Sequence, residues 1–258
     1  MTRRLSPLLG ARAGAALIAG TLTLGGCSVL PQSPPPLDAV SSEVSASSEL
    51  VTPQVSPSPV SVASEVADGF SDEEHAAVRV RTRTCDAFTV GSGFMLDEHT
   101  LVTNRHVVEG AQTITLSTYD GKEYEATGSV TAEFADLALV TVSDSFEFAA
   151  QISSSGPDAG DMLDIVGYPL GGPLETRAGP YVQQVPDELV KGSDDVDLIE
   201  VQAEHGNSGS GVYNSDGQVV GVLYATDESG ESFAVSLESL KRFLSDDSLH
   251  VSNDAVCS

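Results

Sequence analysis

Three short segments carry residues whose types suit nucleophilic catalysis by a hydroxyl group. His106 follows an apolar, strand-like run, Asp136 precedes another such run, and Ser208 lies between two glycines. A serine hydroxyl is a weak nucleophile, so it needs a base within hydrogen-bond distance and a third group that orients this base. We therefore predict Ser208 as the nucleophile, His106 as the base and Asp136 as the orienting group. The chain order His, Asp, Ser is one of those in which such a triad is built.

The loop around the serine reads Gly-Asn-Ser-Gly-Ser-Gly over residues 206–211. We predict that the backbone N–H groups of Gly206 and Ser208 form an oxyanion hole, whose donors are each worth ~10²–10³ in rate. Glycine at 206 suits such a loop because it tolerates a positive φ. Taken alone, this loop would more often be a plain turn, and His106 or Asp136 a structural residue. The three together favour a catalytic site.

Short strands are the elements that must position these residues. Apolar runs separated by turn signals, such as Asp120-Gly121 and Asp216-Gly217, predict an all-β barrel or sandwich. The predicted strands cover 76–82, 91–96, 101–103, 113–116, 137–142, 162–167, 198–201, 219–224 and 232–235. One amphipathic helix is predicted over 237–244, because its leucines and Phe243 share a face.

The first 67 residues have a different composition. Arg3 and Arg4 precede an apolar stretch that is too short and too rich in Gly and Ala for a comfortable membrane span, and it ends in Leu-Gly-Gly-Cys at Cys27. This end resembles the bacterial lipoprotein box, which implies a signal peptide over 1–26 and a lipid-modified Cys27. The alternative is an ordinary secretory peptide with an incidental cysteine. Residues 27–67, rich in Ser and Pro, predict a disordered linker, and the folded domain then spans 68–258.

The charge balance excludes several partners. Twelve Lys and Arg against 38 Asp and Glu give a net charge of −26, and loss of Arg3, Arg4 and Arg12 with the signal peptide makes it −29. Such a charge repels nucleic acid and anionic headgroups. We therefore expect no nucleic-acid partner, and contact with the membrane through the N-terminal lipid anchor only.

The predicted domain contains two cysteines, Cys85 and Cys257. An even pair in an exported protein favours a disulfide, with two reduced thiols as the alternative. No cysteine or histidine pair has the spacing of metal ligands, so no metal site is predicted. His205, which precedes the 206–211 loop, is expected to line a substrate cleft. The remaining histidines lack such a context and are expected at the surface: His75, His99 and His250.

Five segments together resemble the trypsin-like serine endopeptidases of the HtrA/DegP branch. They are Gly-Ser-Gly-Phe at 91–94, Leu-Val-Thr-Asn-Arg-His-Val-Val at 101–108, Asp-Leu-Ala-Leu at 136–139, Val-Gly-Tyr-Pro-Leu-Gly at 166–171 and the 206–211 loop. The resemblance implies two perpendicular, six-stranded antiparallel β-barrels of the chymotrypsin type and a C-terminal helix. It places the active site in the cleft between the barrels and implies no cofactor.

The resemblance also implies substrate contacts. By family position, Gln202 forms the base of the S1 pocket, which holds the substrate residue before the scissile bond (P1). The strand that pairs with the substrate falls at Tyr224, Ala225 and Thr226. A neutral Gln202 favours an uncharged P1 side chain.

Two features depart from the family pattern. Ser210 replaces a glycine of the nucleophile loop, and the chain ends at Ser258 without room for a PDZ domain. With these departures, the sequence predicts a serine endopeptidase tethered by lipid to the extracytoplasmic face of the cell membrane and acting on proteins or peptides. The alternative is a catalytically inactive protease fold that binds peptides or a partner.

Overall fold

The computed structural model describes residues 68–190, 192–227 and 229–253. All of them belong to the second of two compact units, which spans 63–258. The predicted signal peptide, Cys27, the linker over 27–67 and Cys257 lie outside the described residues.

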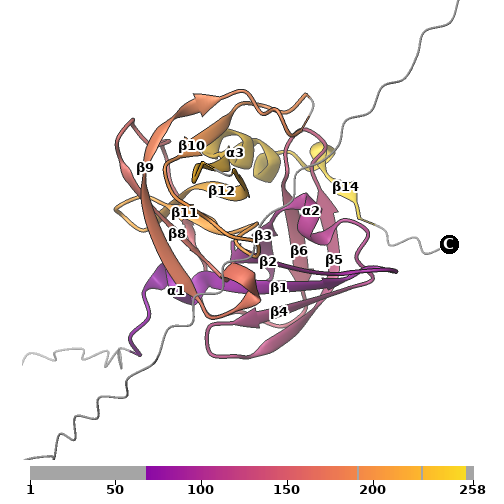
Figure 1. Ribbon diagram of the computed structural model, residues 1–258. Coiled ribbons are helices and arrows are strands. Elements are labelled where there is room, and N and C mark those ends of the chain that lie inside the picture. Colours follow the sequence, from indigo (N-terminus) through magenta and orange to yellow (C-terminus); the bar gives the residue numbers. More distant parts are fainter. Residues whose placement is uncertain (1–67, 191, 228, 254–258) are drawn as a thin grey trace, which may run out of the picture. The chain divides into compact units, whose positions relative to one another are not determined.

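Strands are the predominant secondary structure of the described chain (Figure 1). Its strands are β1 (Ala77–Arg83), β2 (Phe88–Met95), β3 (Thr100–Thr103), β4 (Thr113–Thr118), β5 (Glu123–Thr131), β6 (Ala138–Val142), β7 (Gln151–Ile152), β8 (Met162–Gly167), β9 (Glu175–Val185), β10 (Val196–Ile199), β11 (Gly211–Tyr213), β12 (Gln218–Thr226), β13 (Ser232–Ser236) and β14 (Val251–Ser252). Its helices are α1 (Asp72–Ala76), α2 (Arg105–Val108) and α3 (Leu237–Ser245), with the 3₁₀ turns η1 (Pro169–Gly171) and η2 (Asp247–Leu249).

Two sheets close on themselves. In the first, the order β5-β4-β1-β2-β3-β6 is closed by pairing of β5 with β6, and β14 adds to β5 at one side. In the second, the order β11-β8-β9-β10-β13-β12 is closed by pairing of β11 with β12, while β7 runs parallel to β12. The predicted pair of six-stranded antiparallel barrels followed by a helix is therefore confirmed.

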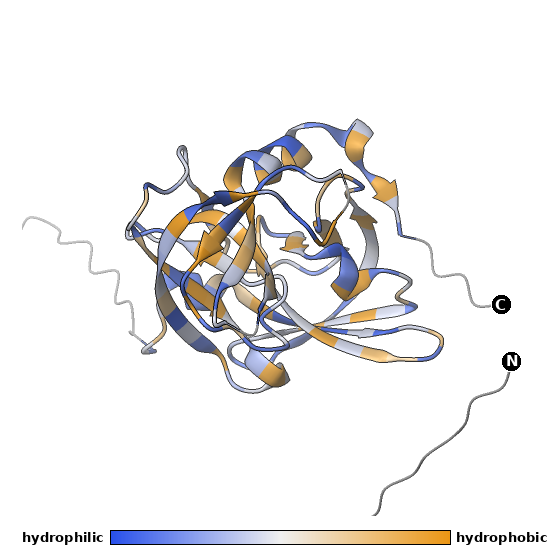
Figure 2. Cartoon of the chain, turned by 45° about the horizontal axis from the view of Figure 1, so that its top comes forward, coloured by the Kyte–Doolittle hydropathy of each residue, from blue (hydrophilic) through white to orange (hydrophobic). Residues whose placement is uncertain are grey.

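Apolar side chains fill each barrel and the space between the two. Along β1, Val78 and Val80 are buried while Arg81 and Arg83 are exposed, as expected for a strand with one face toward a core. Figure 2 shows hydrophobic and hydrophilic residues following one another along many strands. A separate cluster draws residues from both barrels and from α3, and joins them into one packed unit.

Strand β9 was not predicted, and its sequence contains Gly179 and Pro180, two residues that are uncommon inside strands. Both lie in regular pairing with β8, where Pro180 is opposite Met162. A Cβ at Gly179 would lie 2.7 Å from the Cβ of Val201, so the glycine allows the backbones to approach closely. The sequence prediction also missed β5, most of whose residues are polar or small and none of which is buried before Thr131.

The predicted turns and helix are present. Gly121 and Gly217 have φ of +81° and +71° between β4 and β5 and between β11 and β12, respectively. The hydroxyl of Ser236 accepts a hydrogen bond from the Ser239 N–H and caps α3. At nine residues, α3 is the longest helix of the described part of the chain, and no helix there is long and apolar enough to cross a membrane.

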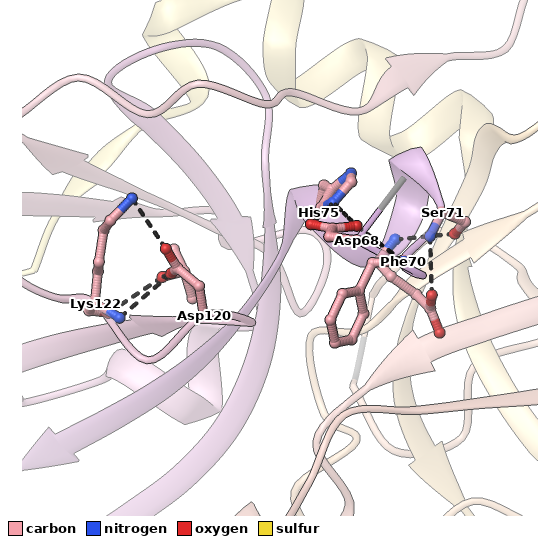
Figure 3. Close-up of polar contacts among 8 residues, drawn as sticks. Asp68, Phe70, Ser71, His75, Asp120 and Lys122 are labelled. Carbon is pink, nitrogen blue, oxygen red and sulfur yellow. Dashed lines mark hydrogen bonds and ion pairs between the residues drawn. The ribbon is translucent and has the colours of Figure 1, made fainter. Parts of the chain in front are cut away.

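The described chain begins with a capped helical turn (Figure 3). The Ser71 hydroxyl accepts from the Glu74 N–H, and the Glu74 carboxylate accepts from the Ser71 N–H, so α1 starts with a capping box. His75, expected at the surface, is instead enclosed: its ring stacks on Phe148 at 4.2 Å and its Nε2 lies 2.9 Å from Asp68 Oδ2. The hydrogen bond from His75 lowers the pKa of Asp68.

An ion pair between Asp120 and Lys122 lies at the turn between β4 and β5. Lys122 Nζ lies 2.9 Å from Asp120 Oδ2 at the exposed β4–β5 turn (Figure 3). Hydrogen bonds from the Thr118 hydroxyl, which has the larger effect, and from Lys122 lower the pKa of Asp120 to about 2.

His250 was also expected at the surface. Its side chain is only 17% exposed, because it packs edge-on against Phe243 and its Nε2 hydrogen-bonds the Phe243 carbonyl.

Candidate active site

His106 and Asp136 form a close pair. The His106 Nδ1 lies 2.5 Å from Asp136 Oδ2, and the backbone N–H of His106 donates to Asp136 Oδ1 at 3.0 Å. Asp136 is 6% exposed, whereas the His106 side chain is 44% exposed. The buried Asn104 donates from Nδ2 to the Asp136 carbonyl at 2.8 Å and so ties the start of α2 to the turn before β6. One carboxylate therefore fixes both the ring and the backbone of the histidine.

This pairing selects the form of the imidazole. When Nδ1 carries the proton and makes a hydrogen bond to Asp136 through it, Nε2 of His106 has no proton and can act as an acceptor. That nitrogen belongs to the exposed part of the pair, on the cleft that His106 lines. The arrangement is the one that a general base requires.

The nucleophile loop of the second barrel is bound to strand β2 of the first. The Ser92 N–H donates to the Ser208 carbonyl, and the Ser92 hydroxyl donates to the Gly206 carbonyl, both at 2.7 Å. Gly206 and Gly209 have φ of +94° and +90°, so both positions require glycine. A Cβ at Gly209 would overlap the Ser92 carbonyl. The two barrels thus hold Ser208 jointly.

The two predicted oxyanion donors are the unused N–H groups of this loop. The N–H of Asn207 donates to Glu204 and that of Gly209 donates to Leu223. Within the described part of the chain, no hydrogen bond uses the backbone N–H of Gly206 or Ser208. Both N–H groups therefore lack a backbone acceptor among the described residues.

A cavity of about 580 Å³ lies against the site. Its lining includes the side chains predicted to act on or contact the substrate, namely His106, Ser208, Gln202, His205, Tyr224, Ala225 and Thr226. Asp136 does not line it and lies behind His106. No hydrogen bond joins Ser208 Oγ to His106 among the described contacts. Such bonds are often long without substrate and tighten in the complex.

Arg177 holds the part of the loop that precedes the nucleophile. Its NH1 donates to the Gln202 carbonyl at 2.9 Å, and its NH2 lies 3.1 Å from a carboxylate oxygen of Glu204. The positive charge of Arg177 therefore balances Glu204 at the wall of the cleft. The hydroxyl of Tyr224 donates to Asp187 at 3.0 Å. Burial raises the pKa of Tyr224, and the negative charge of Asp187 raises it further.

Ser210 fits the loop without backbone strain. Leu170 is the one residue other than glycine with a positive φ in the described chain, so Ser210 does not occupy a position that requires glycine. Its side chain is fully buried, and its hydroxyl lies where a Cβ at Gly167 would be. A glycine on β8 therefore compensates for the serine in the loop.

Sequence reasoning did not assign roles to several residues that hold the site together. They are Ser92, Asn104, Arg177 and Arg79. Small residues on both sides of Ser92 were the available signal, since a backbone approach as close as that of Gly91 to Ser208 excludes larger side chains. No cluster of three His, Cys, Asp or Glu within the described ranges could hold a metal ion.

The family described as the trypsin-like peptidase domain matches residues 91–222, which include all three predicted triad residues. The chain belongs to this family. Serine protease HTRA4 of Mus musculus is 33% identical to this peptidase domain over 163 residues, which are 60% of this chain and 34% of the relative. Serine protease Rv3671c of Mycobacterium tuberculosis (strain ATCC 25618 / H37Rv) is 29% identical over 204 residues, 72% of this chain and 49% of the relative.

Solved structures share the fold. The active form of the Rv3671c protease from M. tuberculosis superposes with a TM-score of 0.62 and 24% identity, covering 85% of this chain and 97% of that one. The HtrA-type protease AlgW with a tripeptide superposes with a TM-score of 0.59 and 22% identity, covering 67% of this chain and 60% of that one. This peptidase domain spans about a third of the first curated relatives that it matches.

Proposed function

We propose that the chain is a serine endopeptidase that cleaves peptide bonds through an acyl-enzyme intermediate. The observation that carries the proposal is that His106, paired with Asp136, lines the same cavity as Ser208, whose loop leaves two N–H groups unused. A nucleophile, an oriented base and free donors on one cavity are the parts that acyl transfer requires.

Each residue has one task in the reaction. The Ser208 hydroxyl attacks the substrate carbonyl and gives its proton to His106 Nε2, while Asp136 stabilises the imidazolium that forms. The N–H groups of Gly206 and Ser208 bind the oxyanion. The imidazolium then protonates the leaving amine, and water, activated by His106 in turn, releases the acyl group from Ser208.

The substrate class follows from the wall of the cleft. Gln202 lines the cavity with an uncharged side chain, and Glu204, which also lines it, forms an ion pair with Arg177. We infer a preference for an uncharged P1 residue. Digestion of a proteome-derived peptide library reads this directly, and cleavage concentrated after Lys or Arg would reject it.

A fluorophosphonate probe tests the chemistry. The full chain should be labelled at neutral pH, and Ser208→Ala should lose the label. Ser210→Gly is the matched control, since it removes the other serine of the same loop and should keep the label. Absence of labelling in the wild type, together with peptide binding but no hydrolysis, would instead favour an inactive peptide-binding fold.

We also propose that the domain is held at the extracytoplasmic face of the cell membrane. The support is the Leu-Gly-Gly-Cys sequence at Cys27 followed by the Ser/Pro-rich stretch over 27–67. Expressed in a bacterium, the full chain should enter the detergent phase and incorporate labelled palmitate, and Cys27→Ser should do neither. An unmodified wild type in the soluble fraction would reject the anchor while leaving the peptidase proposal intact.

A further inference from the structure

A strained turn lies against the oxyanion loop. Leu170, in the 3₁₀ turn η1 after β8, has φ 56° and ψ 16° and is 72% exposed. A left-handed conformation is unfavourable for a leucine, and no burial of its side chain compensates for it here. Contacts elsewhere must hold this turn in place, and strain of this kind gathers at functional sites.

The turn touches the loop that carries the predicted oxyanion donor. The Leu170 N–H donates to the His205 carbonyl at 2.5 Å. A Cβ at Gly206 would lie 2.6 Å from the Tyr168 carbonyl oxygen and 2.7 Å from the Leu170 nitrogen. The peptide between His205 and Gly206 therefore packs directly against the turn, and the turn limits how that peptide can rotate.

Arg79 holds the turn from the other barrel. It lies on β1, and its NH1 donates to the carbonyls of Gly171 and Gly172 at 3.1 and 3.3 Å. Its guanidinium carbon lies 5.5 Å from the centre of the Tyr168 ring, within the range of a cation–π contact. The Arg79 side chain thus contacts both ends of the turn, Tyr168 at one end and Gly171 and Gly172 at the other.

Arg79 differs from an ordinary surface arginine in its partners. In a chain with 12 basic and 38 acidic residues, Arg79 has no carboxylate within ion-pair distance among the described residues. Its Nε is buried without a partner there. By contrast Arg81, two residues along the same strand, makes an exposed ion pair with Glu123. A half-buried guanidinium that donates to backbone carbonyls stabilises the conformation of the chain segment that it contacts.

We propose that Arg79 is a positioning residue for the oxyanion hole. Its hydrogen bonds to Gly171 and Gly172 keep Leu170 left-handed, Leu170 then holds the His205 carbonyl, and the Gly206 N–H faces the cleft. Without Arg79 the turn relaxes, the His205 carbonyl loses its donor, and the Gly206 N–H leaves the oxyanion position part of the time. The inference rests on the proposed peptidase function.

The test compares Arg79→Met with Arg81→Met in the full chain. We expect Arg79→Met to lower kcat for a peptide amide by about 10- to 100-fold, less than the ~10²–10³ for complete loss of a donor. KM should stay within about threefold, because the wall formed by Gln202 and Ala225 is unchanged. Arg81→Met should leave both parameters within about twofold. An unchanged kcat in folded Arg79→Met would overturn the proposal.

Hydrogen exchange separates this proposal from the peptidase function. The amide of Leu170 should exchange faster in Arg79→Met and not in Arg81→Met. Faster exchange in Arg79→Met, together with a wild type that no fluorophosphonate labels, would support the coupling and reject the peptidase. Labelling of the wild type with unchanged exchange in Arg79→Met would do the opposite.

Two further variants keep the test decisive. If Arg79→Met does not fold, Arg79→Lys replaces it: one ammonium cannot reproduce the two-carbonyl contact, so a smaller loss of kcat is expected, and equal kcat with equal exchange would overturn the proposal. Leu170→Gly removes the strain that Arg79 is inferred to hold. In that background the effect of Arg79→Met on kcat should shrink at least threefold, and an undiminished effect would show that Arg79 acts by another route.

Discussion

Ser210 and Gly167 are complementary across the strand pair β8 and β11. The Ser210 hydroxyl occupies the space that a side chain at position 167 would need. The Ser210 Oγ is buried and has no hydrogen-bond partner among the described residues. The loop therefore contains its additional serine because the neighbouring strand has no side chain at that point.

The first prediction follows from this fit. Gly167→Ala should destabilise the protein by ~1–3 kcal/mol, the usual cost of overpacking, and should lower kcat because the displaced loop carries Ser208. Ser210→Gly in the same chain should restore most of the loss. Thermal melting and kcat of the two single variants and the double variant measure the coupling. Additive effects would show that the two positions do not meet.

The second prediction concerns the tautomer of the base. Asp136→Asn keeps the size of the side chain but can present an N–H to His106 Nδ1, which favours the wrong tautomer. We expect kcat to fall by ~10⁴ with folding intact. Glu133→Gln, an exposed substitution in the same turn, is the control and should have wild-type kcat. A loss of less than tenfold in Asp136→Asn would show that the pair does not orient the base.

The third prediction concerns pH and a carboxyl outside the site. Burial raises the pKa of Asp197, on β10, to about 6 from 3.8, against hydrogen bonds from Gln184 and Tyr181 that lower it. Between about pH 4 and 6 the folded chain therefore binds more protons at Asp197 than the unfolded chain, and its stability falls as pH rises through that window.

Asp197→Asn should accordingly stabilise the protein at pH 7, by up to ~3 kcal/mol at 1.4 kcal/mol per pH unit. The gain should shrink toward pH 4, where the carboxyl is neutral in both states. Melting temperatures from pH 4 to 8 measure this, and the exposed Asp164→Asn serves as the control. A gain that is the same at pH 4 and pH 7 would contradict the assignment.

The fourth prediction concerns the two cysteines. Asn253 hydrogen-bonds the Gly110 N–H and the Val108 carbonyl, and so brings the described end of the chain to the side of the first barrel where β1 ends at Arg83. We propose that Cys257, four residues further on, pairs with Cys85. A disulfide between cysteines 172 positions apart is worth roughly 5 kcal/mol on the chain-entropy model.

Cys257→Ser should lower the melting temperature while kcat at 25 °C stays near wild type, because Cys85, its proposed partner, does not line the cleft. Cys85→Ser should have the same effect, and the double variant should add nothing to either. Alkylation of both thiols in the unreduced, exported protein would exclude the pair.

Much of the fold could be read from local patterns. Strands such as β8, whose bounds 162–167 match the prediction, and the helix α3 have periodic apolar residues and turn signals at their ends. Strand β9 could not be read in this way. Gly179 is required by a close contact with residues 200–201, and Pro180 pairs with Met162 of β8. A glycine required by a distant backbone has the same local appearance as one that makes a turn.

The sequence by itself determined the candidate chemistry: the types, order and flanking runs of His106, Asp136 and Ser208, and the glycines that their loop needs. Only the tertiary structure decided how these residues are held, through Ser92 between the barrels, Gly167 beneath Ser210 and Arg79 on the Leu170 turn. The physical reason is that a catalytic residue is marked by its own chemistry and neighbours in sequence. A residue that positions it is marked by a contact with a segment about 40 or more residues away, which leaves no local pattern in the chain.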